Sequence, residues 1–179
     1  MKASTNSVLR LNAKFKKHLQ IGIIPGAGDC GIRSKLEELK IQLGRWYYVF
    51  SLMQVSGCRI NEILKADHGQ ISQEGGLHIK ASKRSRDRYV YAFECSQYLL
   101  KMKYSECAPF HHMNIFAAIR LMKSYHLYTQ KKGRKNMTIT GIFRNEKAKN
   151  VRDSSKDESL TASVLGHKSE KSTSFYGKD

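Results

Sequence analysis

Acidic residues are scarce in this chain of 179 residues, where 15 aspartates and glutamates face 32 lysines and arginines. The resulting formal net charge is +17. In a compact domain these positive charges repel one another unless the domain binds a polyanion. Double-stranded DNA or RNA is the partner that this composition favours. A membrane surface is disfavoured as a partner, because no basic amphipathic helix with a strongly apolar face stands out.

Long apolar runs are also missing. No stretch approaches the length that a membrane span needs, and no signal peptide opens the chain. The four cysteines, Cys30, Cys58, Cys95 and Cys107, do not have the paired spacing of a zinc site. We therefore expect a cytoplasmic protein with reduced thiols. Internal repeats and low-complexity tracts are absent too, so the length indicates one domain.

The positive charge gathers in three short segments: "KASKRSRDR" (80–88), "KKGRK" (131–135) and "RNEKAKNVR" (144–152). Each could be an ordinary solvated face. Three such segments in one small domain favour a surface that contacts phosphates. The DNA-contacting residues predicted from the first two segments are Lys80, Arg84, Arg86, Arg88, Lys131, Lys132, Arg134 and Lys135.

Hydrophobic periodicity predicts a mostly helical α+β fold. The spacing of a capping box puts Ser34 at the start of a long helix and Ser155 at the start of a later one. Gly57 is predicted to end the long helix. The full set of predicted helices covers residues 8–20, 34–56, 58–66, 96–104, 114–128, 138–151, 155–166 and 168–176.

Residues 70–93 differ from the rest, because alternating and β-rich runs flank a Gly-Gly turn and the basic segment at 80–88. This pattern predicts a small antiparallel sheet of two or three strands, with the basic segment on a hairpin. Glycines and a proline between 22 and 31 predict a loop. We therefore divide the chain into an N-terminal extension or linker, 1–33, and a main domain, 34–179.

Three stretches and one lysine resemble the active-site boxes of the tyrosine recombinases, also called the phage integrase family. "SGCRINEIL" (56–64) is similar to the first arginine box and "GIFRN" (141–145) to the second. "LGHKSEKSTSFY" (165–176) resembles the last box, in which a Leu-Gly-His turn precedes the nucleophilic tyrosine. Lys83 falls in the predicted sheet, where the family keeps a β-hairpin lysine. The resemblance implies the family's catalytic domain, a helical bundle with a small antiparallel sheet.

The spacing of these boxes strengthens the resemblance. Arg59 and Lys83 are 24 residues apart, Arg144 and His167 are 23 apart, and His167 and Tyr176 are 9 apart. The intervals from Arg144 to His167 and from His167 to Tyr176 match the family pattern. One box would be weak evidence, whereas four in order are strong.

The resemblance implies a role for each of these residues. Tyr176 attacks a DNA phosphodiester and forms a 3′-phosphotyrosyl link with a free 5′-hydroxyl. Arg59 and Arg144 hold the non-bridging phosphate oxygens, since a guanidinium is always charged and can clasp two oxygens. Lys83 protonates the departing 5′-oxygen, and His167 bonds a phosphate oxygen or assists proton transfer. Neither a metal nor another cofactor is expected, because the cations are built in and no carboxylate cluster appears.

Each residue taken singly has an ordinary explanation. Arg59 could form a helix ion pair with Glu62, a structural partner rather than a catalyst, and His167 could follow a helix C-cap. A different lysine or arginine of the basic segment could carry the role assigned to Lys83, and Lys80 is the nearest rival. The common register of the four boxes favours the catalytic interpretation over these separate ones.

Two departures from the family pattern bear on activity and assembly. The family usually has a histidine three residues before the second arginine, where this chain has Gly141. The residues before 34 are too few for the usual N-terminal DNA-clamping domain, and the chain ends at Asp179 without the usual docking segment. We therefore expect a free monomer that binds DNA mainly through phosphates, with higher-order assembly on DNA reserved for a full-length form.

The sequence favours a site-specific recombinase or integrase and leaves three alternatives open. The first is a catalytically impaired accessory DNA-binding relative, which Gly141 supports. The second is a type IB topoisomerase-like strand transferase, which would share the chemistry without choosing a site. The third is a basic RNA-binding protein, which would leave the register of the boxes unexplained.

Overall fold

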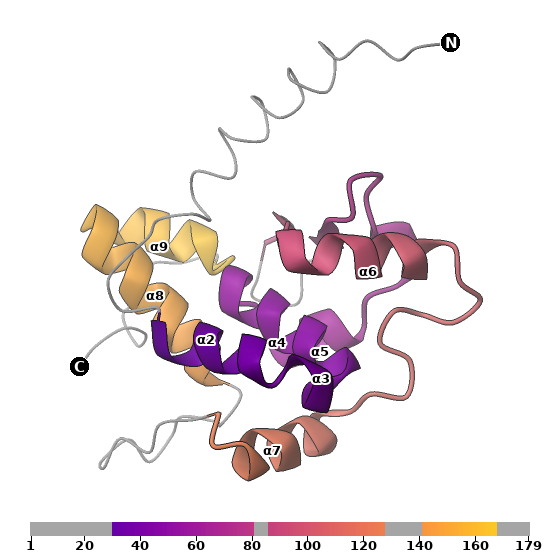
Figure 1. The fold of residues 1–179 in the computed structure, drawn as a ribbon. Coiled ribbons are helices and arrows are strands. Elements are labelled where there is room, and N and C mark those ends of the chain that lie inside the picture. Colours follow the sequence, from indigo (N-terminus) through magenta and orange to yellow (C-terminus); the bar gives the residue numbers. More distant parts are fainter. Residues whose placement is uncertain (1–29, 81–85, 128–140, 168–179) are drawn as a thin grey trace, which may run out of the picture.

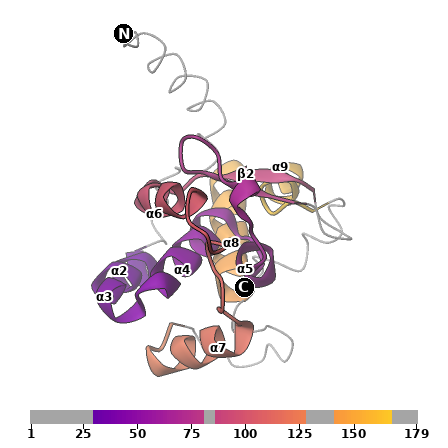
Figure 2. The ribbon, with the colours of Figure 1, turned by 90° about the vertical axis from the view of Figure 1, so that its right-hand side faces the viewer.

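Helix α4, Arg45–Ser56, lies at the centre of the computed structural model, which describes residues 30–80, 86–127 and 141–167 (Figures 1 and 2). Its buried side chains point in several directions around the helix, and Tyr47, Val49, Phe50 and Leu52 have no exposed surface. A helix that is apolar on most sides must be covered on most sides. Helices α2, α5, α6 and α8 pack around it.

In the part of the chain that the structure describes, helices follow one another and one antiparallel pair of strands interrupts them. In order, they are α2 Cys30–Glu38, α3 Lys40–Leu43, α4 Arg45–Ser56, α5 Ile60–Leu64, the 3₁₀ helix η1 His68–Gln70, β1 Leu77–Ile79, β2 Arg88–Val90, α6 Phe93–Lys103, α7 Ile115–Ser124, α8 Ile142–Ser155 and α9 Glu158–Val164. The α+β fold class predicted from the sequence is confirmed.

Aromatic rings join the central helix to its neighbours. Phe50 of α4 stacks on Phe143 of α8 with ring centroids 5.8 Å apart. Tyr48 of α4 lies almost parallel to Tyr98 of α6, at 4.1 Å and 6°. Each such ring pair stabilises the folded state by about 1 kcal/mol beyond what burial of its apolar area contributes. They fix α8, which carries Arg144, against the helix that leads to Arg59.

The predicted helix 34–56 was wrong at its start and in its continuity. The structure begins α2 at Cys30, so Ser34 lies inside a helix rather than at its cap. Gly44 breaks the remainder, because its φ of 53° and ψ of −125° are a backbone conformation that L-residues rarely adopt. The predicted end is confirmed, since Gly57 is left-handed and its N–H donates to the Met53 carbonyl at 2.7 Å.

The predicted cap at Ser155 was also wrong. Ser155 is the last residue of α8, and its hydroxyl donates back to the Val151 carbonyl. Lys156 then reverses the chain at a φ of 53°, and Asp157 caps α9. The Asp157 carboxylate accepts from the N–H groups of Ser159 and Leu160, which an aspartate at an N-cap does at least as well as serine.

The predicted antiparallel sheet is confirmed in residues 70–93. Strands β1 and β2 pair with Leu77 opposite Val90 and Ile79 opposite Arg88, and an isolated bridge joins Ile71 to Leu77. The paired part of the hairpin therefore ends at Arg88, the residue that turns toward the site described below.

The remaining predictions divide between confirmed elements and undescribed residues. The predicted helix 114–128 is confirmed as α7, but it ends at Ser124 rather than at residue 128. Helix α6 starts at Phe93 rather than at residue 96, and α8 ends at Ser155 rather than at residue 151. The predicted helices 8–20 and 168–176 lie outside the described residues. The division of the chain at residue 33 stays a prediction.

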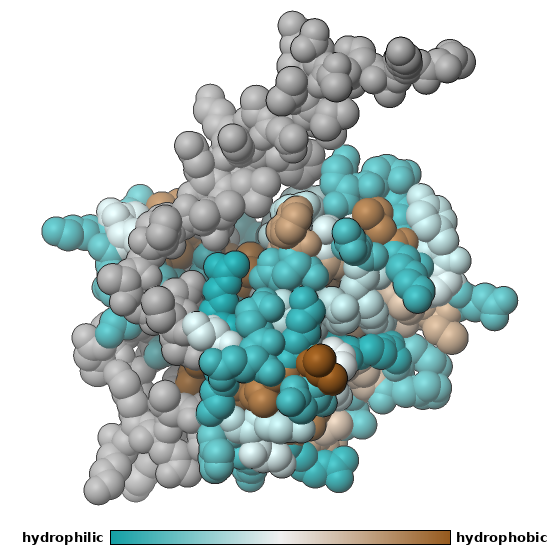
Figure 3. Space-filling view, viewed as in Figure 1, coloured by the Kyte–Doolittle hydropathy of each residue, from teal (hydrophilic) through white to brown (hydrophobic). Residues whose placement is uncertain are grey.

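The surface in Figure 3 is mainly hydrophilic, with hydrophobic residues in separate small spots. Among the described residues, the exposed large hydrophobic side chains lie on α3, at the two ends of α6 and on α7: Ile41, Phe93, Tyr104 and Phe116. Among the helices that the structure describes, none has the length and apolar character to cross a membrane.

Candidate active site

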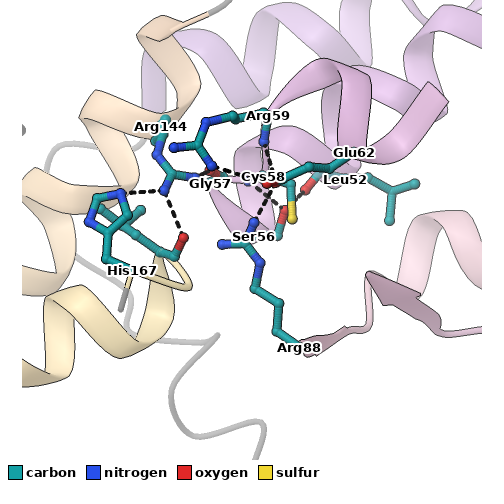
Figure 4. Close-up of polar contacts among 10 residues, drawn as sticks. Leu52, Ser56, Gly57, Cys58, Arg59, Glu62, Arg88, Arg144 and His167 are labelled. Atoms are coloured by element: carbon teal, nitrogen blue, oxygen red, sulfur yellow. Dashed lines mark hydrogen bonds and ion pairs between the residues drawn. The ribbon is translucent and has the colours of Figure 1, made fainter. Parts of the chain in front are cut away.

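Arg144 joins three segments that are far apart in the sequence (Figure 4). It lies in the first turn of α8 and is only 2% exposed. Its Nη1 donates to the Gly57 carbonyl at 2.6 Å, and its Nη2 donates to the Leu165 carbonyl at 2.7 Å. Nη2 also lies 2.5 Å from Nε2 of His167. The guanidinium therefore ties α8 to the turn after α4 and to the end of α9.

The turn at Gly57 brings Arg59 to the same place. Gly57 has a φ of 64°, and a Cβ there would lie 2.8 Å from Leu165 Cδ2 and 3.3 Å from the Lys147 side chain. Only glycine satisfies both the left-handed backbone and this close packing. Arg59 follows in extended backbone as the N-cap of α5, and its side chain is 44% exposed. It is the arginine of the site that solvent reaches most easily.

Glu62 is a buried carboxylate shared by two arginines. Its Oε1 accepts from Arg59 Nη1 at 3.1 Å, and its Oε2 accepts from the Arg59 backbone N–H at 2.9 Å. Oε2 also accepts from Arg88 Nη2 at 2.5 Å. The side chains of Glu62 and Arg88 are only 7% and 10% exposed. The carboxylate both caps α5 and orients the Arg59 guanidinium.

His167 is held as a neutral acceptor. Its backbone N–H donates to the Ala162 carbonyl at 2.8 Å, which fixes the turn after α9. Burial lowers the pKa of His167 to about 4, and the positive charges of Arg144, Arg59 and Arg88 act in the same direction. The imidazole is therefore uncharged at neutral pH. Since Nε2 accepts from Arg144, the ring proton sits on Nδ1.

Cys58 lies beside these charges but is not a candidate nucleophile. It is 1% exposed, and its backbone N–H donates to the Ser56 hydroxyl. Burial raises the pKa of its thiol, although the charge of Arg88 opposes the shift. Because the thiolate is the reactive form, a buried thiol of raised pKa is inert at neutral pH.

The predicted site residues divide into three groups. Arg59, Arg144 and His167 meet in this cluster although the chain separates them widely. Lys83 and Tyr176 lie outside the described residues, so their roles stay predictions. So do the predicted DNA contacts at Arg84, Lys131, Lys132, Arg134 and Lys135.

The other predicted DNA contacts differ in exposure. Arg86 is exposed, and Lys80 pairs with Asp67 at 3.3 Å with both side chains largely in solvent. Arg88 is nearly buried and faces Glu62. The sequence pattern did not indicate this inward position, because the basic residues around Arg88 resemble a uniform solvated cluster and its partner is 26 residues away.

Comparison with solved structures identifies the fold. A crystal structure of XerA recombinase matches 88% of this chain with a TM-score of 0.63 and 19% identity. The XerH site-specific recombinase bound to a palindromic difH substrate, in a post-cleavage complex, matches 87% with a TM-score of 0.56 and 17% identity. This chain has the tyrosine-recombinase fold. It spans 60% of the XerA chain and 49% of the XerH chain.

Similarity at the level of sequence is much weaker than similarity of fold. No family model and no curated protein sequence matches the chain. The likeness to the recombinases therefore rests on the backbone and on the short boxes around Arg59, Arg144 and His167. These boxes are also where the structure brings distant segments together.

Proposed function

We propose that the chain cleaves and rejoins DNA as the catalytic part of a site-specific tyrosine recombinase. The observation that supports this most is the meeting of Arg59, Arg144 and His167 from three separate segments on a recombinase fold. Each of them lies in one of the boxes identified by spacing. An arrangement of three arginines around one neutral histidine, with a single carboxylate, suits a phosphodiester rather than a neutral substrate.

In the proposed reaction Tyr176 gives up its phenolic proton to solvent water as its oxygen attacks the scissile phosphorus, and the bond from phosphorus to the 5′-oxygen breaks. The products are a 3′-phosphotyrosyl ester and a 5′-hydroxyl, and Lys83 supplies the proton that the departing oxygen needs. The energy of the phosphodiester is kept in the tyrosyl ester, so rejoining is the reverse attack by a 5′-hydroxyl. Neither a nucleotide nor a metal is required by this scheme.

The two arginines of the boxes have different tasks in the proposal. Arg59 is the accessible one, and its guanidinium receives a non-bridging oxygen of the phosphate. Arg144 already bonds two carbonyls and His167, so it holds the site together while its charge stabilises the phosphate at short range. Neutral His167 carries its proton on Nδ1, and an imidazole N–H is a donor that a phosphate oxygen can accept.

Trapping on nicked DNA tests the proposal and does not require that the target site be known. A pool of random-sequence duplexes, each with a nick close to the position of cleavage, releases a short fragment and leaves a covalent protein–DNA adduct. Sequencing the trapped DNA would give a common site if the chain is a recombinase. Failure to form any adduct, with DNA binding retained, would instead support the accessory DNA-binding relative.

The same chemistry without site choice is the second candidate, because a type IB topoisomerase would use the same cluster of cations. Relaxation of supercoiled plasmids that lack the trapped site distinguishes the two. We expect adducts at one sequence and no relaxation of such plasmids. Efficient relaxation of every plasmid would favour the topoisomerase-like enzyme.

A further inference from the structure

Arg88 occupies a position that neither DNA contact nor simple charge balance explains. It is the first residue of β2, paired with Ile79 at the end of the ladder, and its side chain is only 10% exposed. One nitrogen, Nη2, pairs with Glu62. Within the described chain, the buried Nε and Nη1 have no hydrogen-bond partner. A buried guanidinium with so few partners is costly, which suggests that its place serves more than stability.

The guanidinium of Arg88 lies flat against Gly166. A Cβ built on Gly166 would lie 2.8 Å from Nη1, 2.9 Å from Cζ and 3.0 Å from Nε of Arg88. Gly166 also has a φ of 66°, so both its backbone and its surroundings require glycine. The backbone N–H of Arg86 donates to the Gly166 carbonyl at 2.9 Å. The second arm of the hairpin is therefore docked on the residue that precedes His167.

These contacts form a continuous path between the parts of the candidate site. Arg88 bonds Glu62, and Glu62 bonds Arg59 (Figure 4). Arg88 also lies against Gly166, in the turn that carries His167. Lys83 lies in sequence between β1 and β2, three residues before Arg86. Movement of Arg88 would therefore affect the Arg59 guanidinium, through Glu62, and the turn that carries His167.

We propose that Arg88 is a positioning residue, which fixes the Arg59 guanidinium through Glu62 and docks the hairpin arm on Gly166. This inference rests on the proposed function. It also assigns Arg88 a role other than the phosphate contact predicted from the sequence. Arg88 acts on the reacting groups through Glu62 and Gly166, so its loss affects the rate on bound DNA more than the affinity for DNA.

The first test uses Arg88→Gln and, as a matched control, Arg120→Gln, which removes the same charge from an exposed position on α7. Nuclear magnetic resonance of the free protein follows the Arg59 Nε–H signal and the titration of His167. In Arg88→Gln we expect the Arg59 signal to shift or broaden and the pKa of His167 to rise, because a nearby positive charge is gone. Arg120→Gln should leave both unchanged.

This measurement does not depend on catalysis, so it decides the inference even if the protein forms no DNA adduct. Unchanged Arg59 and His167 signals in Arg88→Gln would overturn the inference whatever the activity. Absence of an adduct from the unmodified protein would overturn the proposed function instead. The two failures are therefore distinguishable.

The second test measures single-turnover cleavage of the trapped nicked substrate at saturating DNA. Arg88→Gln should slow cleavage by roughly 10- to 100-fold, the size expected for a small misplacement of catalytic groups, and change the DNA dissociation constant by less than about threefold. Arg88→Lys should recover part of the rate, since an ammonium can still pair with Glu62. Arg120→Gln should cleave at the unmodified rate.

A double-mutant cycle with Glu62→Gln separates a shared path from independent effects. If Arg88 acts through Glu62, the total loss of cleavage rate in the double variant should be much smaller than the product of the losses in the two single variants. Gly166→Ala provides a variant that keeps the Arg88 charge but displaces its guanidinium, and it should also slow cleavage. A rate loss equal to the product, or weakened binding with an unchanged rate, would overturn the inference.

Discussion

Replacing Arg144 with alanine should destabilise the fold as well as the reaction. The change leaves the Gly57 and Leu165 carbonyls without their donor, and both residues are buried. Each unsatisfied buried acceptor costs about 1–3 kcal/mol. Part of the cost of the two carbonyls is offset, because alanine does not carry the desolvation penalty of a buried guanidinium. We therefore expect the free energy of unfolding to fall by about 2–4 kcal/mol. For a domain of ordinary stability, such a loss is a large fraction of the whole free energy of unfolding.

Urea denaturation followed by circular dichroism measures this loss. The midpoint should fall while the slope stays constant, because the surface exposed on unfolding is nearly unchanged. Arg120→Ala, an exposed arginine on α7, is the control and should change stability by no more than about 0.5 kcal/mol. A loss below about 1 kcal/mol for Arg144→Ala would refute the assigned role of Arg144 as the tie between α8, the Gly57 turn and α9.

Three further predictions follow from the same site. Arg59→Ala should lower the single-turnover cleavage rate by about 100-fold or more while weakening DNA binding, measured by titration, only modestly. Equal losses of cleavage rate and of DNA affinity would make Arg59 an ordinary phosphate contact. Gly141→His should fold normally, because the φ of −76° at Gly141 suits any residue, and it should raise cleavage if the missing histidine limits the rate; a fall in rate would contradict this. The protein should lose stability as pH falls from about 6.5 toward 4, because His167 takes up a proton more readily in the unfolded state than in the folded state. In urea titrations, the difference in free energy of unfolding between the unmodified protein and His167→Gln should shrink over that pH range, and a constant difference would argue against a lowered pKa of His167.

Local signals in the sequence were sufficient for much of the fold. The Gly57 helix end, the helix that begins next to residue 114 and the hairpin in residues 70–93 each depend on neighbours within a few positions. Gly44 was different, since a glycine inside an apolar helical pattern is often tolerated and only its observed dihedral angles reveal a break. The cap of α9 was misassigned because Ser155 and Asp157 both suit an N-cap and stand two residues apart.

The candidate site was predictable in its boxes but not in its connections. Register and spacing pointed to Arg59, Arg144 and His167, which the structure brings together. The carbonyl partners of Arg144 and the inward turn of Arg88 depend on segments far apart in the chain. No periodicity or cap encodes such contacts. For Gly166, the requirement for glycine becomes clear only when Arg88 is seen lying against it.

The most direct test of the proposed function is to identify the residue that becomes attached to DNA. The trapped adduct is digested with protease and nuclease, and the modified peptide is sequenced by mass spectrometry. We expect a single 3′-phosphate ester on Tyr176, a free 5′-hydroxyl on the released strand, and no adduct from Tyr176→Phe although that variant still binds DNA. Attachment to another residue, or an adduct that survives Tyr176→Phe, would rule out Tyr176 as the nucleophile.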